Sequence, residues 1–259
     1  MRRETYIKIT DLSHEARLRE LKKADVRSKI LADKDIRHPS EGSMENVYEY
    51  FGANLHQMFQ LRHNTDYEPE ENRSIAAIAN AQGRSAQEVM YDALVEGDGT
   101  GFCVLLGPSY HQFSLEPVKQ MIEHKSSVLG LGDAGAHVNF VSDGVLPTFS
   151  LIHWVRDRQR GNKLPIELII NKQTAATASL YGLKDRGVLA VGKRADINII
   201  DLEKLAIGDF ELQADLPAGG TRILQSATGY VATFVKGVQT RGNGVDLGRR
   251  PGRLIRGVH

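Results

Sequence analysis

Short apolar runs that alternate with helical segments constrain the fold of this chain most. The run at 102–106 is bounded by glycines, as buried strands often are. A helix is predicted to follow at 114–124, with Pro117 in its first turn, and it leads directly into a second apolar run at 128–131. This strand, helix, strand order favours an α/β architecture with a parallel sheet.

The chain before residue 102 is predicted to be mainly helical. Residues 11–35 carry the narrow apolar stripe of a surface helix, whereas 38–73 indicate a loop-rich region with short helices and no buried strand. Two helices should follow, one at 74–81 that Gly83 closes and one that a capping box at 85–88 opens.

The pattern changes near the end of the chain. Helices are predicted at 148–160 and 165–182, and the later residues are rich in β-forming side chains. Lys236-Gly237 is a tight-turn signal between two such segments. We therefore expect two parts, an α/β part at 1–186 and a β segment at 187–259.

Charge and cysteine content exclude several classes of protein. The 259 residues contain 33 Lys and Arg against 32 Asp and Glu, and this near balance provides no field that would attract nucleic acid or an anionic membrane. No apolar stretch approaches the length of a membrane span. Cys103 is the single cysteine, which excludes an internal disulfide and fits a reducing compartment, so a cytoplasmic location is expected.

Asp133 is the first candidate for a functional residue. It lies among glycines in the segment LGLGDAGAH at 129–137, just past the predicted strand at 128–131. The carboxyl ends of strands carry the catalytic groups of (β/α)8 barrels. The alternative interpretation is a turn aspartate that caps nearby backbone amides.

The same segment also matches Gly-x-Gly-x-x-Gly at Gly130, Gly132 and Gly135, the pattern of a dinucleotide-binding turn. Such a site needs a helix that starts at the third glycine, but 138–147 has the composition of a loop. Asp157, at a suitable distance for a ribose contact, falls inside a predicted helix. A dinucleotide-binding oxidoreductase is therefore the remotest hypothesis.

Other candidates are weaker. The nine histidines never form His-x-His or His-Glu-x-x-His, and His56 and His63 are best explained as solvated residues. Cys103 lies in an apolar run, where it should act as a small buried hydrophobe. Ser109 lacks the Gly-x-Ser-x-Gly context of a serine hydrolase.

Three further segments carry a family resemblance. Residues 181–201 read YGLKDRGVLAVGKRADINIID, 232–237 read ATFVKG and 251–256 read PGRLIR. Together with the Gly-Asp-Ala-Gly-Ala-His segment, they resemble the closing signature of the amidohydrolase superfamily. Within it, the N-acyl-D-amino-acid deacylase branch, also called D-aminoacylase-like, is the most similar.

The resemblance implies a (β/α)8 TIM barrel beside a small β-sandwich, and hydrolysis of carbon–nitrogen bonds other than peptide bonds in N-acyl amino acids. It implies a divalent metal, zinc above all, bound by a His-x-His after the first strand and by ligands after middle strands. Asp133 matches the aspartate after the eighth strand, which would exchange a proton between metal-activated water and the leaving amine and could also contact the metal. His137 would face the substrate or form a loop hydrogen bond.

The ligands of the earlier strands are missing from this sequence. Seven strand and helix units of about 30 residues need roughly 210 residues, whereas 132 precede Asp133. We therefore expect the last part of a barrel, beginning after the sixth strand, that is inactive alone and binds zinc weakly. The competing hypothesis is a non-catalytic scaffold subunit that docks onto a partner chain supplying the missing barrel strands.

Overall fold

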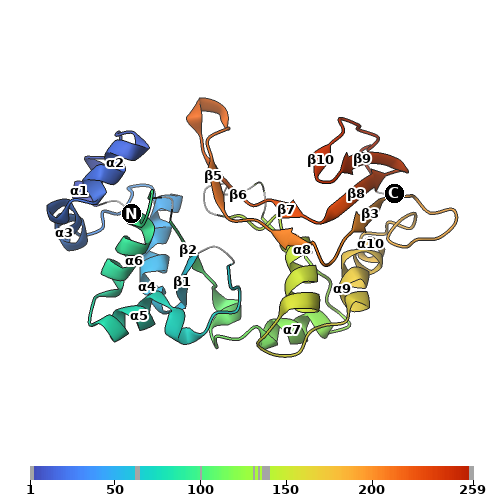
Figure 1. Ribbon diagram of the computed structural model, residues 1–259, viewed down its shortest axis with the longest axis horizontal. Helices are drawn as coiled ribbons and strands as arrows, with labels where there is room; N and C mark the ends of the chain where they lie inside the picture. The colour runs from blue at the N-terminus through green and yellow to red at the C-terminus, as the bar shows by residue number, and fades with distance from the viewer. Residues whose placement is uncertain are drawn as a thin grey trace. The chain divides into compact units, whose positions relative to one another are not determined.

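The computed structural model describes residues 3–61, 65–99, 101–130, 132–133, 135 and 141–256. The chain divides into two compact units, Met1–Leu115 and Glu116–His259 (Figure 1). This division after Leu115 differs from the predicted boundary between barrel and sandwich parts at residue 186, which stays a prediction.

The first unit consists mainly of short helices around one pair of strands. Its elements in chain order are α1 (Glu4–Ile7), α2 (His14–Leu21), α3 (Ala24–Ala32), η1 (Met44–Val47), α4 (Tyr48–Ala53), η2 (Leu55–Gln57), β1 (Met58–Leu61), η3 (Glu71–Arg73), α5 (Ile75–Gln82), α6 (Ala86–Val95), β2 (Phe102–Leu105) and η4 (Pro108–Tyr110).

The predicted helix starts and stops at α5 and α6 are confirmed. The Ser74 hydroxyl caps the start of α5, and Gly83 ends it in the left-handed conformation. Ser85 and Glu88 form the predicted capping box of α6. The single surface helix expected at 11–35 is wrong, because the chain breaks between α2 and α3 at Lys22-Lys23.

The strand predicted at 102–106 is present as β2, but the parallel sheet predicted around it is wrong. β2 pairs antiparallel with β1, so that Met58 lies opposite Leu105 and Leu61 opposite Phe102. The sequence of the β1 region predicts no strand. Its four residues MFQL are too few to show a clear alternation, although Met58 and Phe59 are buried.

The core of the first unit gathers around Ile75, which is fully buried. Leu55, Met58 and Val89 pack in the same cluster, and Cys103 lies against it. Burial raises the pKa of the Cys103 thiol to about 12. Cys103 is therefore a protonated packing residue, as expected from the sequence, and not a nucleophile.

The second unit has helices followed by strands. Its elements are α7 (Glu116–Glu123), α8 (Leu146–Phe149), η5 (Ser150–Asp157), α9 (Ile166–Gln173), α10 (Ala175–Leu180), β3 (Ile197–Ile200), β4 (Ala206–Ile207), β5 (Glu211–Gln213), η6 (Pro217–Gly219), β6 (Arg222–Leu224), β7 (Ala227–Thr228), β8 (Tyr230–Val235), β9 (Val238–Gly242) and β10 (Val245–Asp246).

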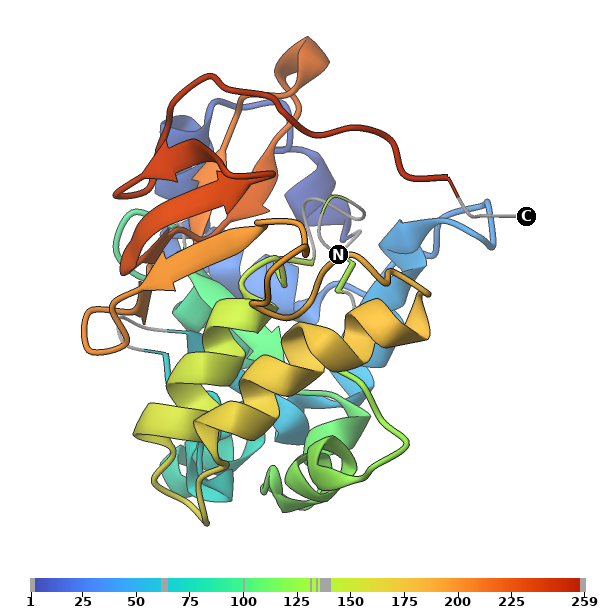
Figure 2. The same ribbon diagram turned by 90° about the vertical axis from the view of Figure 1, so that its right-hand side faces the viewer.

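The helices of this unit lie at the predicted positions, but two of them differ from the prediction in helix type or continuity. α7 occupies the segment expected at 114–124. The helix expected at 148–160 is α8 continued by η5, a π-helix. The helix expected at 165–182 is broken into α9 and α10 at Thr174, whose φ and ψ angles of −127° and −88° are not helical. Figure 2 shows η5 and α9 side by side.

The parallel sheet is not found among the described residues. Residues 128–130 have no strand conformation, and every strand pair of the described chain is antiparallel. The largest sheet has the order β10-β9-β8-β3. The structure is thus mixed α and β with antiparallel sheets. An apolar run between glycines identifies a strand but not its partner, which is why the direction of pairing was wrong.

The predicted turn at Lys236-Gly237 is confirmed. It joins β8 to β9, with Val235 opposite Val238. Both turn residues have positive φ angles, 52° and 75°, as a type I′ turn requires. No helix within the described ranges is long and apolar enough to cross a membrane.

Candidate functional site

Asp133 lies in a loop between α7 and α8, with its side chain exposed to solvent. Its backbone N–H donates a 2.7 Å hydrogen bond to Oδ2 of Asp143, which lies ten residues further on. The Asp133 carboxylate itself accepts no hydrogen bond from any residue that the structure describes. The alternative interpretation, a turn aspartate that caps backbone amides, therefore fits Asp143 and not Asp133.

Asp143 is the residue that the sequence analysis missed. One of its oxygens, Oδ1, is buried and has no hydrogen-bond partner within the described part of the chain. Gly132 lies so close that a Cβ there would come within 2.4 Å of the Asp143 carboxylate. This close approach explains the glycine before Asp133. The signal in the sequence was Ser142-Asp143-Gly144, which indicates a loop but not which backbone the carboxylate binds.

A small cavity of about 120 Å³ lies beside this loop. Residues of the loop and of the segment around β6 line it together: Gly135, Val141, Ser142, Gly144, Val145, Arg222, Ile223, Leu224 and Gln225. Arg222, one of the lining residues, pairs with Asp215 at 2.6 Å. Small-molecule sites have volumes of about 300–1,000 Å³, so this cavity alone could hold only a small group.

The described residues do not fit a catalytic metal. They contain no cluster of three or more His, Cys, Asp or Glu side chains. Asp133 and Asp143 provide two carboxylates, whereas a catalytic zinc needs three protein ligands and an open position for water. His137, the other predicted site residue, lies outside the described residues.

The remaining candidates gain no role from the structure. His56 is exposed, and His63 lies outside the described residues. Ser109 is exposed in η4. Asp157 binds the guanidinium of Arg156, and this hydrogen-bonded pair lowers the pKa of Asp157.

The dinucleotide-binding turn finds no support among the described residues. Gly135 lies in a turn, and the described residues after it, 141–145, form a loop before α8 begins at Leu146. A pyrophosphate site would need a helix that begins at the third glycine.

Two of the segments that suggested the family meet in the structure. Asp196, from the Ala-Asp pair, accepts a 2.8 Å hydrogen bond from the backbone N–H of Lys236 in the β8–β9 turn. Gly237 N–H donates to the Ala195 carbonyl at 2.8 Å. Arg194 and Arg186 bind the same carboxylate at 2.8 Å and 3.1 Å. The Ala-Asp pair therefore has a structural role, since it fastens the turn.

This junction predicts a stability change at Asp196. Burial acts to raise its pKa, but the Lys236 N–H, Arg194 and Arg186 outweigh burial and lower the pKa. Asp196→Ala removes the acceptor and should reduce the free energy of unfolding by about 1–3 kcal/mol. Asp196→Asn retains an acceptor for Lys236 N–H and should lose less. Urea titrations of the three proteins measure this.

The lowered pKa of Asp196 also predicts how the stability of the protein depends on pH. Because the pKa of Asp196 is lowered on folding, its ionised form adds stability above its unfolded pKa near 3.8, and that contribution is lost as the pH falls through the lower folded value. The stability gap between the original protein and Asp196→Asn should therefore close on acidification. A gap that stays constant from pH 7 to pH 2 would contradict the ion-pair interpretation.

Comparison with known proteins identifies the class. The model of the amidohydrolase family matches residues 17–241, which include most of both units. The chain belongs to the amidohydrolase family, a family of hydrolases that generally bind divalent metals. The match begins well before the segments that suggested the resemblance, and it ends before the Pro251-Gly252 segment. No curated protein and no solved structure matches the chain significantly.

Proposed function

We propose that this chain carries the catalytic aspartate of a metal-dependent amidohydrolase that cleaves carbon–nitrogen bonds outside peptides, with N-acyl amino acids as substrates. The observation that carries the proposal is the contrast within one loop. The backbone of Asp133 is held by Asp143, while the Asp133 carboxylate is exposed and has no partner among the described residues. A carboxylate held in place but left unpaired is suited to proton transfer.

Amide hydrolysis requires two proton movements that one carboxylate can perform. Asp133 takes a proton from the attacking water as its oxygen adds to the amide carbon. It then gives that proton to the nitrogen as the carbon–nitrogen bond breaks, so that a neutral amine leaves. Asp143 is a positioning residue in this scheme, because its Oδ2 fixes the Asp133 backbone.

The resemblance assigns the missing metal ligands to the first and middle strands of a barrel. The sequence contains no His-x-His, and the described residues provide no cluster of three ligands. We therefore propose that the chain contributes the last part of a (β/α)8 TIM barrel with its β-sandwich segment, and that the remaining ligands lie outside it. The cytoplasmic location expected from the single cysteine stays a prediction.

A metal titration tests this proposal. The purified chain should contain far less than one zinc per molecule by elemental analysis, because two carboxylates are too few for a tight site. Chelator treatment should leave its melting temperature unchanged. One tightly bound zinc per chain, lost together with stability on chelation, would overturn the proposed incompleteness.

An exposed apolar segment favours a second candidate function, a scaffold subunit. Val188, Leu189 and Val191 are 48%, 82% and 106% exposed, and residues 187–190, at the start of the predicted β segment 187–259, form no strand. A strand from a partner chain would cover these side chains. Light scattering of the protein from its source cells distinguishes the two functions. A hetero-oligomer whose activity survives Asp133→Asn would favour the scaffold.

A further inference from the structure

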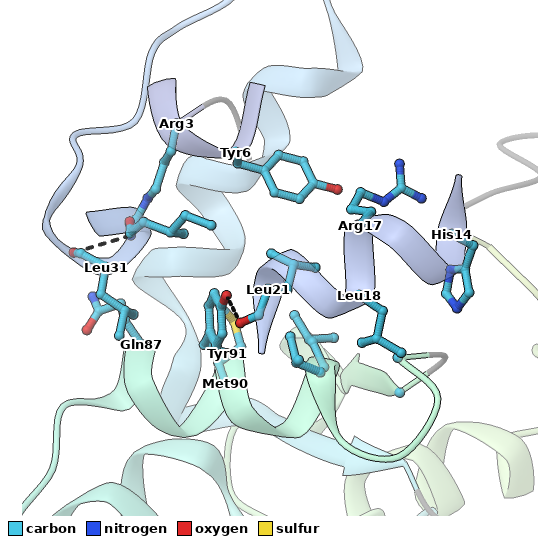
Figure 3. A pocket seen from close by; sticks show the side chains of 15 residues that line it. Arg3, Tyr6, His14, Arg17, Leu18, Leu21, Leu31, Gln87, Met90 and Tyr91 are labelled. Carbon is cyan, nitrogen blue, oxygen red and sulfur yellow. Dashed lines mark hydrogen bonds between the residues drawn. The ribbon is translucent and has the colours of Figure 1, made fainter. Parts of the chain in front are cut away.

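The first unit contains a pocket that lies away from Asp133 in the sequence and belongs to the helices α1, α2, α3 and α6. Its volume is about 320 Å³, within the range of small-molecule sites. The walls are mainly apolar. Figure 3 shows Leu18 and Leu21 from α2 and Met90 from α6 among them, and Leu94 from α6 also lines the pocket. Leu18, Leu21 and Met90 are partly buried and Leu94 is exposed, so the pocket offers apolar surface to a ligand.

The charged side chains that line the pocket are all basic. Arg3, His14 and Arg17 are among the described lining residues, and no Asp or Glu is. Arg3 is already neutralised by Asp35 at 3.0 Å and 3.2 Å. Arg17 donates only to the Thr10 carbonyl, at 3.0 Å, and pairs with no carboxylate of the described chain. Arg17 is therefore the cation left for a ligand.

Tyr6 adds a second polar group beside Arg17. In Figure 3 its hydroxyl points toward the Arg17 side chain, above Leu18 and Leu21 in this view. The hydroxyl has no hydrogen-bond partner within the described ranges. A guanidinium and a phenol hydroxyl on the same side can both donate to one carboxylate.

Hydrogen bonds hold the walls of the pocket in place. His14 Nε2 lies 2.8 Å from the Asp98 carbonyl oxygen, and Lys22 Nζ donates to the Gly97 carbonyl at 2.6 Å, so both ends of α2 are fastened to the turn after α6. At Gly99 in that turn, φ is 74° and a Cβ would approach Leu18 to 2.6 Å, so the close contact depends on glycine.

The other walls are fastened in the same way. The Tyr91 hydroxyl donates to the Leu21 carbonyl at 2.9 Å, which joins α6 to α2. Arg27 of α3 binds Asp92 of α6 with two hydrogen bonds of 2.8 Å and 3.1 Å. A pocket built in this way is formed before a ligand arrives, which lowers the entropic cost of binding.

We propose that this pocket binds an amphipathic anion, an apolar chain that ends in a carboxylate. The chain would lie against Leu18, Leu21 and Met90, and the carboxylate would accept hydrogen bonds from Arg17 and Tyr6. The lining residues of this site all belong to the first unit, and its binding does not depend on the proposed hydrolysis.

Calorimetric titration of the whole chain with sodium decanoate tests the proposal. Decanoate should bind with a Kd below about 1 mM, and 1-decanol should bind more weakly. Arg17→Gln should weaken decanoate about tenfold and leave 1-decanol unchanged, because it removes a charge-assisted hydrogen bond. Arg19→Gln is the matched control, since Arg19 lies exposed on the same helix and its loss should leave both affinities unchanged.

Two results of these titrations would contradict the proposed site. Absence of decanoate binding at millimolar concentration would overturn the proposal, as would equal weakening by Arg17→Gln and Arg19→Gln. N-octanoylglycine has an amide between its apolar chain and its carboxylate. Its affinity, compared with that of decanoate, shows which of two ligand classes the site prefers. If it binds more tightly than decanoate, the site takes acyl amino acids, and if it binds more weakly, the site takes free alkyl carboxylates.

Discussion

Replacing Asp133 by asparagine is expected to lower the rate of N-acyl amino-acid hydrolysis by about 10²–10⁴-fold, the usual contribution of a general acid or base. Asparagine has nearly the same shape but cannot accept a proton from water or return one to the amine. The Asp143 hydrogen bond goes to the backbone of residue 133, so the loop should keep its conformation in this variant. The loss should therefore appear in kcat more than in KM.

The measurement needs protein isolated from its source cells, so that any partner carrying metal ligands is retained. N-acetyl-D- and N-acetyl-L-amino acids are the substrates, and release of the free amino acid is followed. Glu203→Gln is the matched control, because it removes one carboxylate charge at an exposed position of the same unit. A variant at Asp133 that keeps more than half of the original activity would remove this residue from the proposed mechanism.

Asp143 separates positioning from proton transfer. Asp143→Asn retains an oxygen that can accept the Asp133 N–H, whereas Asp143→Ala does not. If Asp143 acts only by holding the loop, the asparagine variant should keep most of the activity and an unchanged pH profile, and alanine should lose more. A changed pH profile in Asp143→Asn would instead mean that its own carboxylate titrates in the reaction.

Local signals in the sequence predicted local structure well. The capping box at Ser85, the stop at Gly83 and the turn at Lys236-Gly237 are determined by residues within a few positions of each other. The approximate positions of α7 and α9 followed from Pro117 and Pro165 in the same way. These features depend on backbone chemistry that a short stretch contains.

Features that depend on distant partners were not predicted. The pairing of β2 with β1 joins Leu105 to Met58, and no residue near β2 specifies that partner. At the candidate site, Asp133 was visible because of its glycine-rich surroundings. Asp143 was not, because its role arises only when the loop brings it back to the Asp133 amide. The segment at 187–190 had β character but lacks a described strand to pair with, so its composition alone misled the prediction.

The second large effect is expected at Trp154, the single tryptophan of the chain. Its side chain, on η5, is 2% exposed. The guanidinium carbon of Arg158 lies 5.0 Å from the centre of its ring, and the Arg158 side chain is itself fully buried. Trp154→Ala should reduce the free energy of unfolding of the second unit by about 3–5 kcal/mol, because it opens a cavity and removes the face on which Arg158 lies.

Urea unfolding followed by far-UV circular dichroism measures this effect without relying on tryptophan fluorescence. Trp154→Phe is the matched control, since it keeps an aromatic face for Arg158 and should cost only about 1–2 kcal/mol. Arg158 still binds Glu116 at 3.2 Å and the Asn162 carbonyl at 3.0 Å in both variants, so the difference between alanine and phenylalanine reports on the ring. A change in the free energy of unfolding of less than about 1 kcal/mol is too small to indicate a core anchor. If both variants stay within that range of the original protein, Trp154 does not anchor the core of this unit.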